Sequence, residues 1–213
     1  MSGASRERRL EQVYGARSNA ELRAIYDDWA GQYDEDLRAF GYSFPPPIAG
    51  LVARYVSERE ARILDAGAGT GLVGEVLSIL GYTELTGIDL SDGMLAAARA
   101  KGVYGELKNQ VLGERLDFPD DRFAAVVSAG VLTTGHAPPS CFDELIRIVR
   151  PGGHLIFTLT MPVYEEGGFK PKLEALVAER RWRPIETTPA WCALPRSRSE
   201  SALLARAHVF EVA

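Results

Sequence analysis

The feature that most constrains this 213-residue chain is a short apolar run that leads directly into three closely spaced glycines. The run occupies residues 62–66, glycines follow at positions 67, 69 and 71, and an apolar helical pattern begins at Leu72. This order predicts a strand, a glycine loop and a helix, the opening unit of a parallel α/β sheet. Glycine lets the backbone turn sharply and approach a ligand closely, because no Cβ intervenes. The helix N-terminus adds unpaired N–H groups, so we expect a nucleotide-like ligand in the loop.

Strand and helix patterns alternate through the following residues, which favours an α/β fold with helices on both faces of a sheet. Further strands are predicted at residues 85–89, within 103–112, at 124–128, at 154–159, and as two strands between 183 and 213 around a polar turn at 195–199. Helices are predicted at residues 72–80, 94–100, 142–149 and 168–182, with Ser91 as a candidate N-cap of the second. We expect the two strands at the end of the chain to be antiparallel.

A helical segment rich in aromatic residues precedes the sheet. Residues 1–20 are charged and mixed, and they predict a frayed or loosely docked helix. From residue 22 to 37, apolar and aromatic side chains recur at three- and four-residue steps, which indicates an amphipathic helix that Gly31 and Gly41 interrupt or end. The prolines at 45–47 predict a stiff hinge before a second helical stripe at 48–56. We therefore expect one domain over residues 1–213, with a helical cap at 1–56 and an α/β core at 57–213.

Composition excludes several classes of protein. The formal net charge of -5 argues against a protein that grips nucleic acid with its whole surface. No segment approaches the roughly 18 apolar residues that a membrane span requires, and the first residues are too polar for a secretory signal. Cys141 and Cys192 have no metal-ligand spacing with each other or with the histidines, so we predict no metal site. A cytoplasmic protein is expected.

The glycine loop is compatible with two kinds of cofactor. Positions 69, 71 and 74 match the dinucleotide pattern G-x-G-x-x-G, and Asp89, at the end of the next strand, fits a ribose-binding acid in a dinucleotide site or an adenosyl site. However, the glycines begin at Gly67, and the carboxylate of Asp65 suits an ammonium group but repels a pyrophosphate. The chain also has little room for the separate substrate domain of a hydride-transfer enzyme. These features favour the adenosyl interpretation.

In combination, the motifs at residues 64–71, 87–91, 116–119 and 145–153 resemble those of the class I S-adenosylmethionine-dependent methyltransferases. Residues 26–34 and 127–131 extend the likeness to nearly the whole chain. The resemblance implies a Rossmann-like, three-layer αβα fold with a seven-stranded, mostly parallel sheet whose last strand is antiparallel. It also implies that S-adenosylmethionine lies over the carboxyl ends of the strands.

The resemblance assigns roles to individual residues. The loop glycines would approach the methionine moiety, Asp89 would bind both ribose hydroxyls, and Leu90 and Met94 would flank the adenine. Val111 and Leu112 stand where family members often carry an acid that binds the adenine amino group, so backbone groups would bind the adenine here. The predicted cofactor-binding residues are Tyr26, Tyr33, Asp65, Gly67, Ala68, Gly69, Thr70, Gly71, Asp89, Leu90, Met94, Val111, Leu112, Ser128, Ala129 and Gly130.

Two side chains are candidates for catalysis. His136 lies in the loop after the predicted fourth strand, where open α/β sheets bind substrates, and a histidine there suits a general base. The alternative is a loop histidine that hydrogen-bonds backbone or merely lines the pocket. Tyr33, and with it Tyr26, belongs to the apolar stripe of the cap, but a tyrosine hydroxyl can reach cofactor or substrate from such a stripe. His154 and His208 are expected to be structural.

Together these observations predict an S-adenosylmethionine-dependent methyltransferase that acts on a small-molecule acceptor beneath the helical cap. Residues 128–131 have the sequence Ser-Ala-Gly-Val in place of the Asn-Pro-Pro-Tyr run used by methyltransferases of amide nitrogens, which argues against a DNA modifier. Two alternatives stay open at this point. One is a protein that binds the cofactor without transferring a methyl group, and the other is an NAD-dependent oxidoreductase.

Overall fold

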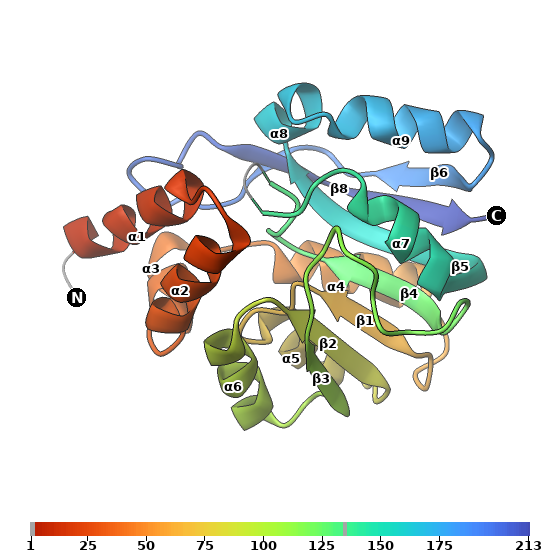
Figure 1. Cartoon of the computed structure of the whole chain (residues 1–213), viewed down its shortest axis with the longest axis horizontal. Coiled ribbons are helices and arrows are strands. Elements are labelled where there is room, and N and C mark those ends of the chain that lie inside the picture. Colours follow the sequence, from red (N-terminus) through yellow and green to blue (C-terminus); the bar gives the residue numbers. More distant parts are fainter. Residues whose placement is uncertain (1–2, 134–135) are drawn as a thin grey trace.

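A computed structural model describes residues 3–133 and 136–213, and it places a mixed β-sheet between layers of helices (Figure 1). The main path of the sheet runs in the order β3-β2-β1-β4-β5-β8-β6, and the short β7 pairs with β8. The strands are β1 (Ile63–Ala66), β2 (Leu85–Asp89), β3 (Glu106–Asn109), β4 (Phe123–Ser128), β5 (Val149–Thr160), β6 (Trp182–Thr187), β7 (Trp191–Cys192) and β8 (Leu204–Val212). The predicted mostly parallel sheet with an antiparallel last strand is confirmed, because β8 runs antiparallel to both β5 and β6.

The number of strands differs from the prediction of seven. The additional strand, β7, has only two residues and forms two pairs with β8. A segment this short carries no periodic pattern, so its pairing depends on where the folded chain places it beside β8. The predicted polar turn is also longer than expected and connects β7 to β8.

The alternation of side chains along the central strands divides the core in two. One apolar cluster joins Ile63, Val127 and Val209 to the cap and to α4 (Pro45–Tyr55) and α5 (Leu72–Ile79). The other joins Leu64 and Phe157 to α7 (Cys141–Ile148) and α9 (Phe169–Ala178). Burial of both faces explains why β1, apart from Asp65, and β4, up to Ser128, are apolar rather than alternating.

The remaining helices of the core are α6 (Asp92–Lys101) and α8 (Met161–Glu166). Ser91 was the expected N-cap of α6, and its hydroxyl accepts a hydrogen bond from the N–H of Met94 at 3.0 Å. The six-residue helix α8 was not predicted, because it is too short to show a helical period. None of the helices in the described part of the chain is long and apolar enough to cross a membrane.

Three helices, α1 (Gly3–Gly15), α2 (Asn19–Trp29) and α3 (Tyr33–Phe40), lie together at one end of the sheet, and we call these three helices the cap (Figure 1). The predicted cap at 1–56 also included α4, which packs with α5 in the core. The break between α2 and α3 falls at Gly31, as expected. The prediction of a stiff hinge at residues 45–47 is wrong, since these prolines form the first turn of α4. Proline is tolerated there because the N–H groups of a first turn have no partner within the helix.

Helix α1 is firmly attached, contrary to the expectation of a loosely docked segment. The carboxylate of Glu7 accepts hydrogen bonds from the hydroxyls of Ser197 and Ser199 and from the N–H of Arg198, at 2.7 to 3.0 Å. On its other side, Nε of Arg6 donates to the buried carboxylate of Asp36 at 2.8 Å. Both contacts join residues far apart in the sequence, so a local pattern cannot predict them.

Helix α2 packs against the start of α6. The carboxylate of Asp27 accepts hydrogen bonds from Ser91 Oγ at 2.6 Å and from the N–H of Gly93 at 2.8 Å. Nε of Arg23 donates to the carbonyl of Leu90 at 2.8 Å. A Cβ on Gly93 would lie 2.9 Å from the Cα of Asp27, so this glycine permits the close approach of the two helices.

We predict that Gly93→Ala forces α2 away from α6 and lowers the free energy of unfolding by about 1–3 kcal/mol, the usual cost of overpacking. Chemical denaturation, monitored by circular dichroism, would measure this free energy. Gly50→Ala is the matched control, because a Cβ there meets nothing within 4 Å and alanine favours the α4 helix. An unfolding free energy of Gly93→Ala equal to that of the unchanged protein would show that the α2–α6 contact is not tight.

Candidate active site

A cavity opens where β1, β2 and β4 end beneath the cap. Backbone from the glycine loop and from the segment after β4 forms its floor, and three tyrosines from the cap side form its roof. The lining residues are Tyr26, Tyr33, Tyr42, Gly67, Ala68, Gly69, Thr70, Leu72, Val73, Asp89, Met94, Ala129, Gly130, Val131 and His136. We call it the cofactor cavity. Ten of the predicted cofactor-binding residues are in this set, together with His136.

The glycine loop has the conformation that its sequence predicts. Gly67, Gly69 and Gly71 have φ values of +81°, +54° and +89°, a region that side-chain-bearing residues rarely adopt. A Cβ on Gly67 would lie 2.3 Å from a methyl of Val131, whereas a Cβ on Gly69 would meet nothing within 4 Å. Gly67 is therefore needed for packing of the loop, and Gly69 leaves open space for a ligand.

Asp89 joins the two loops that border the cofactor cavity. Its Oδ2 accepts a hydrogen bond from the N–H of Gly69 at 2.8 Å, and its Oδ1 accepts one from the N–H of Ser91 at 2.9 Å. Burial raises the pKa of this carboxyl above its ordinary value, and the N–H donors oppose that shift. Each carboxylate oxygen has a second acceptor position, so Asp89 retains the capacity to bind two ribose hydroxyls.

Asp65 lies beneath the glycine loop. It is buried, and its Oδ2 accepts a hydrogen bond from the hydroxyl of Tyr104 at 2.6 Å. Burial raises the pKa of this carboxyl to about 7, while the bond from Tyr104 acts in the opposite direction. Asp65 is not among the described residues that line the cavities, so its predicted contact with the cofactor stays a prediction.

Tyr104 is a residue that the sequence analysis missed. Its ring packs against the backbone of three glycines, and a Cβ on Gly74 would lie 2.3 Å from the tyrosine hydroxyl. A Cβ on Gly71 would lie 3.0 Å from the same ring, and a Cβ on Gly87 would lie 3.3 Å from it. Gly74 was the last glycine of the apparent dinucleotide pattern, and the structure shows that it accommodates this ring. The sequence signal that could have indicated a packed ring at this place was the presence of glycines with no assigned role.

A second hollow adjoins the first on the far side of Asp89. Its lining includes Leu90, Gln110, Val111 and Leu112, together with Val131 and His136. The structure thus brings Leu90, Val111 and Leu112 together, as expected for an adenine site. Three other predicted residues, Asp65, Gly71 and Ser128, are not among the described residues that line these cavities. The hydroxyl of Ser128 donates to the carbonyl of Ala66 at 2.8 Å and so links β4 to β1.

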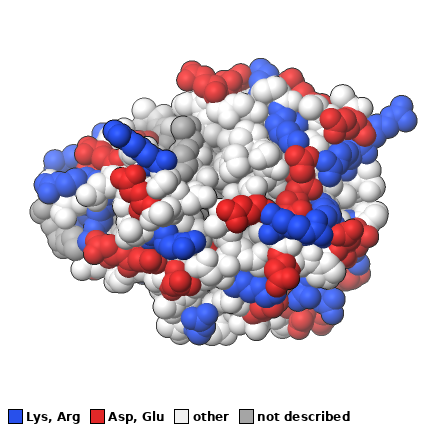
Figure 2. All heavy atoms as spheres, viewed as in Figure 1, with Lys and Arg blue, Asp and Glu red and all other residues white. Residues whose placement is uncertain are grey.

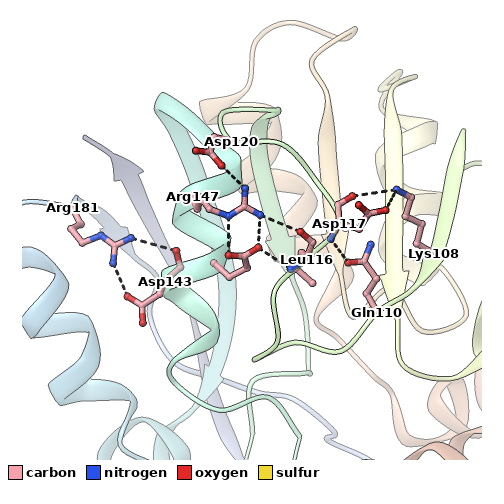
Figure 3. Close-up of polar contacts among 9 residues, drawn as sticks. Lys108, Gln110, Leu116, Asp117, Asp120, Asp143, Arg147 and Arg181 are labelled. Atoms are coloured by element: carbon pink, nitrogen blue, oxygen red, sulfur yellow. Dashed lines mark hydrogen bonds and ion pairs between the residues drawn. The ribbon is translucent and has the colours of Figure 1, made fainter.

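Side chains outside the pocket fix the wall of this second hollow (Figure 3). Arg147 of α7 donates to the carbonyl of Leu116 at 3.2 Å and to Asp120 at 2.5 Å. Glu144 accepts from the N–H of Leu116 at 2.8 Å and pairs with Arg147, which lowers the pKa of its carboxyl. Residue 116 is thus bound through both its N–H and its carbonyl. Helix α7 therefore holds the end of the loop that carries Val111 and Leu112.

His136 and Tyr26 form a pair at the border of the cavities. The hydroxyl of Tyr26 lies 2.9 Å from Nε2 of His136, and Tyr33 packs edge-on against Tyr26. Burial raises the pKa of both tyrosines above the ordinary value of 10, so both hydroxyls keep their protons near neutral pH. The preceding loop residues, Thr134 and Gly135, lie outside the described residues.

Beyond this pair lies a third cavity, which we call the aromatic chamber. It shares Tyr26, Tyr33, Tyr42, Gly130 and His136 with the cofactor cavity, so the two spaces are adjacent. Its other walls come from the cap helices, from the ends of β4 and β5, and from the segment between β7 and β8. These walls include Leu10, Val13, Trp29, Leu132, Thr158 and Leu194. Tyr42, whose hydroxyl donates to the carbonyl of Ala129, is a lining residue that sequence reasoning missed.

Comparison with known proteins identifies the family. Residues 64–157 match the family model described as a methyltransferase domain. The chain is 31% identical to human methyltransferase-like protein 27, over 92% of this chain and 89% of that protein. It belongs to the class I S-adenosylmethionine-dependent methyltransferases. It is also 34% identical to a demethylmenaquinone methyltransferase of Clavibacter sepedonicus, over 83% of this chain and 82% of the relative.

Solved structures show the same fold. The [4+2]-cyclase SpnF superposes with a TM-score of 0.72 at 16% identity, covering 92% of this chain and 97% of the other. Structures described as S-adenosylmethionine-dependent methyltransferases, among them one from Methanosarcina mazei, follow with TM-scores of 0.61 and 0.59. Membership of the methyltransferase family gives S-adenosylmethionine as the cofactor, and the dinucleotide alternative is set aside.

The residues present fit this cofactor. The open space above Gly69 leaves room for a ligand close to the backbone, and Asp89, which lines the same cavity, keeps a second acceptor position on each carboxylate oxygen. Leu90, Val111 and Leu112 offer an apolar surface suited to a flat base. The pKa of Asp65 matters here, because a nearby ammonium group would favour its charged form.

We predict that cofactor affinity rises between about pH 5 and pH 7, if Asp65 faces the cofactor ammonium. The folded carboxyl has a pKa of about 7, so below that pH it must release a proton before it can pair with a cation. Calorimetry with S-adenosylhomocysteine in two buffers of different ionisation enthalpy would detect the released proton. Asp65→Asn should abolish the release. An affinity independent of pH would place the ammonium away from Asp65.

Proposed function

We propose that this methyltransferase acts on a small-molecule acceptor, which is held in the aromatic chamber beneath the cap while the cofactor occupies the adjoining cavity. The observation that carries the proposal is that two adjacent cavities share the Tyr26–His136 pair at their border. The relative named as a demethylmenaquinone methyltransferase agrees with a small acceptor. A protein that only bound the cofactor would have no need of the second cavity.

The cap is placed to exclude water from the reacting groups. Asp34 of α3 accepts a hydrogen bond from Thr70 Oγ1 of the glycine loop at 2.5 Å and pairs with Lys101 at 2.7 Å. Together with the contacts of Asp27 to α6, this bond closes the cap over the glycine loop. An enclosed site suits methyl transfer, because the nucleophile must lose its hydration and align with the methyl carbon.

S-adenosylmethionine, when bound, supplies an electrophilic methyl group on a sulfonium leaving group, so the protein has mainly to orient the acceptor. If the accepting atom carries a proton, His136 would remove it. When the imidazole is protonated on both nitrogens, its Nε2–H would donate to the Tyr26 oxygen. The Tyr26 oxygen would then stabilise the imidazolium through the hydrogen bond at 2.9 Å.

The distribution of charge agrees with a small acceptor rather than a nucleic acid. Figure 2 shows acidic and basic side chains interspersed over the visible face, with no extended basic area on that face. Lys101, beside the glycine loop, is paired with the carboxylates of Asp34 and Glu75. Recognition of nucleic acid relies on unpaired basic side chains that bind phosphates.

We predict that Asp89→Asn weakens binding of S-adenosylmethionine and S-adenosylhomocysteine by about 10- to 100-fold, the usual range for loss of charged hydrogen bonds. Titration calorimetry would measure this, with NAD as the ligand expected not to bind. Asp92→Asn is the matched control, because Asp92 is exposed and its carboxylate accepts from Asn109. Unchanged affinity in Asp89→Asn would mean that the ribose lies elsewhere.

We predict that His136→Asn slows methyl transfer by about 100-fold or more when the accepting atom carries a proton, while cofactor affinity stays within a few-fold. A screen of small-molecule acceptors with labelled methyl groups would find the acceptor and give the rate. Tyr26→Phe should lower the rate less, because the imidazole remains. Failure of every acceptor with cofactor-saturated protein would favour the binding-only alternative.

A further inference from the structure

We propose that the methyl acceptor is an uncharged, largely apolar and planar molecule. This inference rests on the proposed function and concerns the walls of the aromatic chamber. None of the described residues that line the chamber is an aspartate, glutamate, lysine or arginine. Their polar side-chain atoms are tyrosine and threonine hydroxyls, the imidazole of His136 and the indole N–H of Trp29, which donates to Asp36. A charged acceptor would lose its hydration without gaining a counter-ion, and that loss is costly.

Two carboxylates of α3, adjacent in sequence to lining residues of the chamber, are already paired. Asp36 binds Arg6 and accepts from the indole N–H of Trp29, and Arg9 lies 3.5 Å from the same carboxylate. Asp34 pairs with Lys101. These charges therefore offer no ready partner to an ionic acceptor. A carboxylate, phosphate or ammonium group in the chamber would be buried without compensation.

The shape of the walls favours a flat ring. Tyr26, Trp29 and Tyr33 form a group of mutually packed aromatic rings, with centroids 4.8 to 6.4 Å apart. Tyr42 and Phe44 pack edge to face at 5.2 Å on another part of the lining. Aromatic walls bind planar apolar molecules by stacked or edge-on contacts.

The polar atoms of the chamber indicate how such a molecule would be oriented. Tyr26 and His136 lie where the chamber meets the cofactor cavity, whereas Leu10 and Val13 line it from α1. Both apolar residues are buried, at 7% and 3% exposure, although α1 is the first helix of the chain. An acceptor with one hydroxyl and an apolar body would direct the hydroxyl toward His136 and its body toward α1.

The test uses two probes of similar size and shape, 1-naphthol and 1-naphthoate, titrated at pH 7 into protein saturated with S-adenosylhomocysteine. We expect naphthol, which is uncharged, to bind at least 10-fold more tightly than naphthoate. Val13→Lys places a cation in the chamber wall and should remove or reverse that preference. Gln12→Lys, the matched control, adds the same charge to an exposed neighbour on α1 and should leave it unchanged.

Binding of S-adenosylhomocysteine and the circular dichroism spectrum show whether each variant is folded. Leu203→Lys, at another lining position, replaces Val13→Lys if that variant does not fold. Failure of the unchanged protein to bind S-adenosylhomocysteine would contradict the proposed function itself. With the cofactor product bound, the inference is wrong if naphthol is not preferred, if neither probe binds, or if the lysine at position 13 and that at position 12 have the same effect.

Discussion

The cofactor cavity depends on buried carboxylates at the ends of parallel strands. These carboxylates bind backbone N–H groups and hydroxyls. Asp89 connects the glycine loop to the start of α6 through Gly69 and Ser91. Beneath the loop, Asp65 binds Tyr104, whose ring supports the loop glycines from behind. A buried acid is costly unless it is paired or neutralised, so these two positions place the loop backbone within narrow limits. The loop is thereby held in a conformation suited to its ligand before the ligand arrives.

The same principle attaches the cap. Asp27 binds the N-terminus of α6, and Asp34 binds the glycine loop and Lys101. Helices α2 and α3 of the cap are therefore bonded to the start of α6 and to the glycine loop, while α1 binds the segment before β8. Under the proposed function, the bonds of α2 and α3 would open to admit cofactor and acceptor and would then enclose both. The enclosed chamber has uncharged walls, which suits a reaction in which a nucleophile must be stripped of water.

Local chemistry was enough to predict several parts of this arrangement. The order of strand, glycine loop and helix, the N-cap at Ser91 and the break at Gly31 were all predicted, because each depends on residues adjacent in sequence. The prolines at 45–47 were misassigned, since proline equally suits a hinge and a first helical turn, and only the contacts of the helix decide between them. Tyr104 and Tyr42 were missed because their partners lie distant in the sequence.

The sequence by itself determined the fold class, the position of the glycine loop and the acid that follows the second strand. Spacing is sufficient for these features, because strand and helix periods and the need for positive φ values are local properties. Only the tertiary structure decided that Tyr26 meets His136 across 110 positions of chain, that Glu7 holds the segment before β8, and that charged side chains are kept out of the chamber. The physical reason is that packing brings together residues with no local relation, and their contacts define the aromatic chamber.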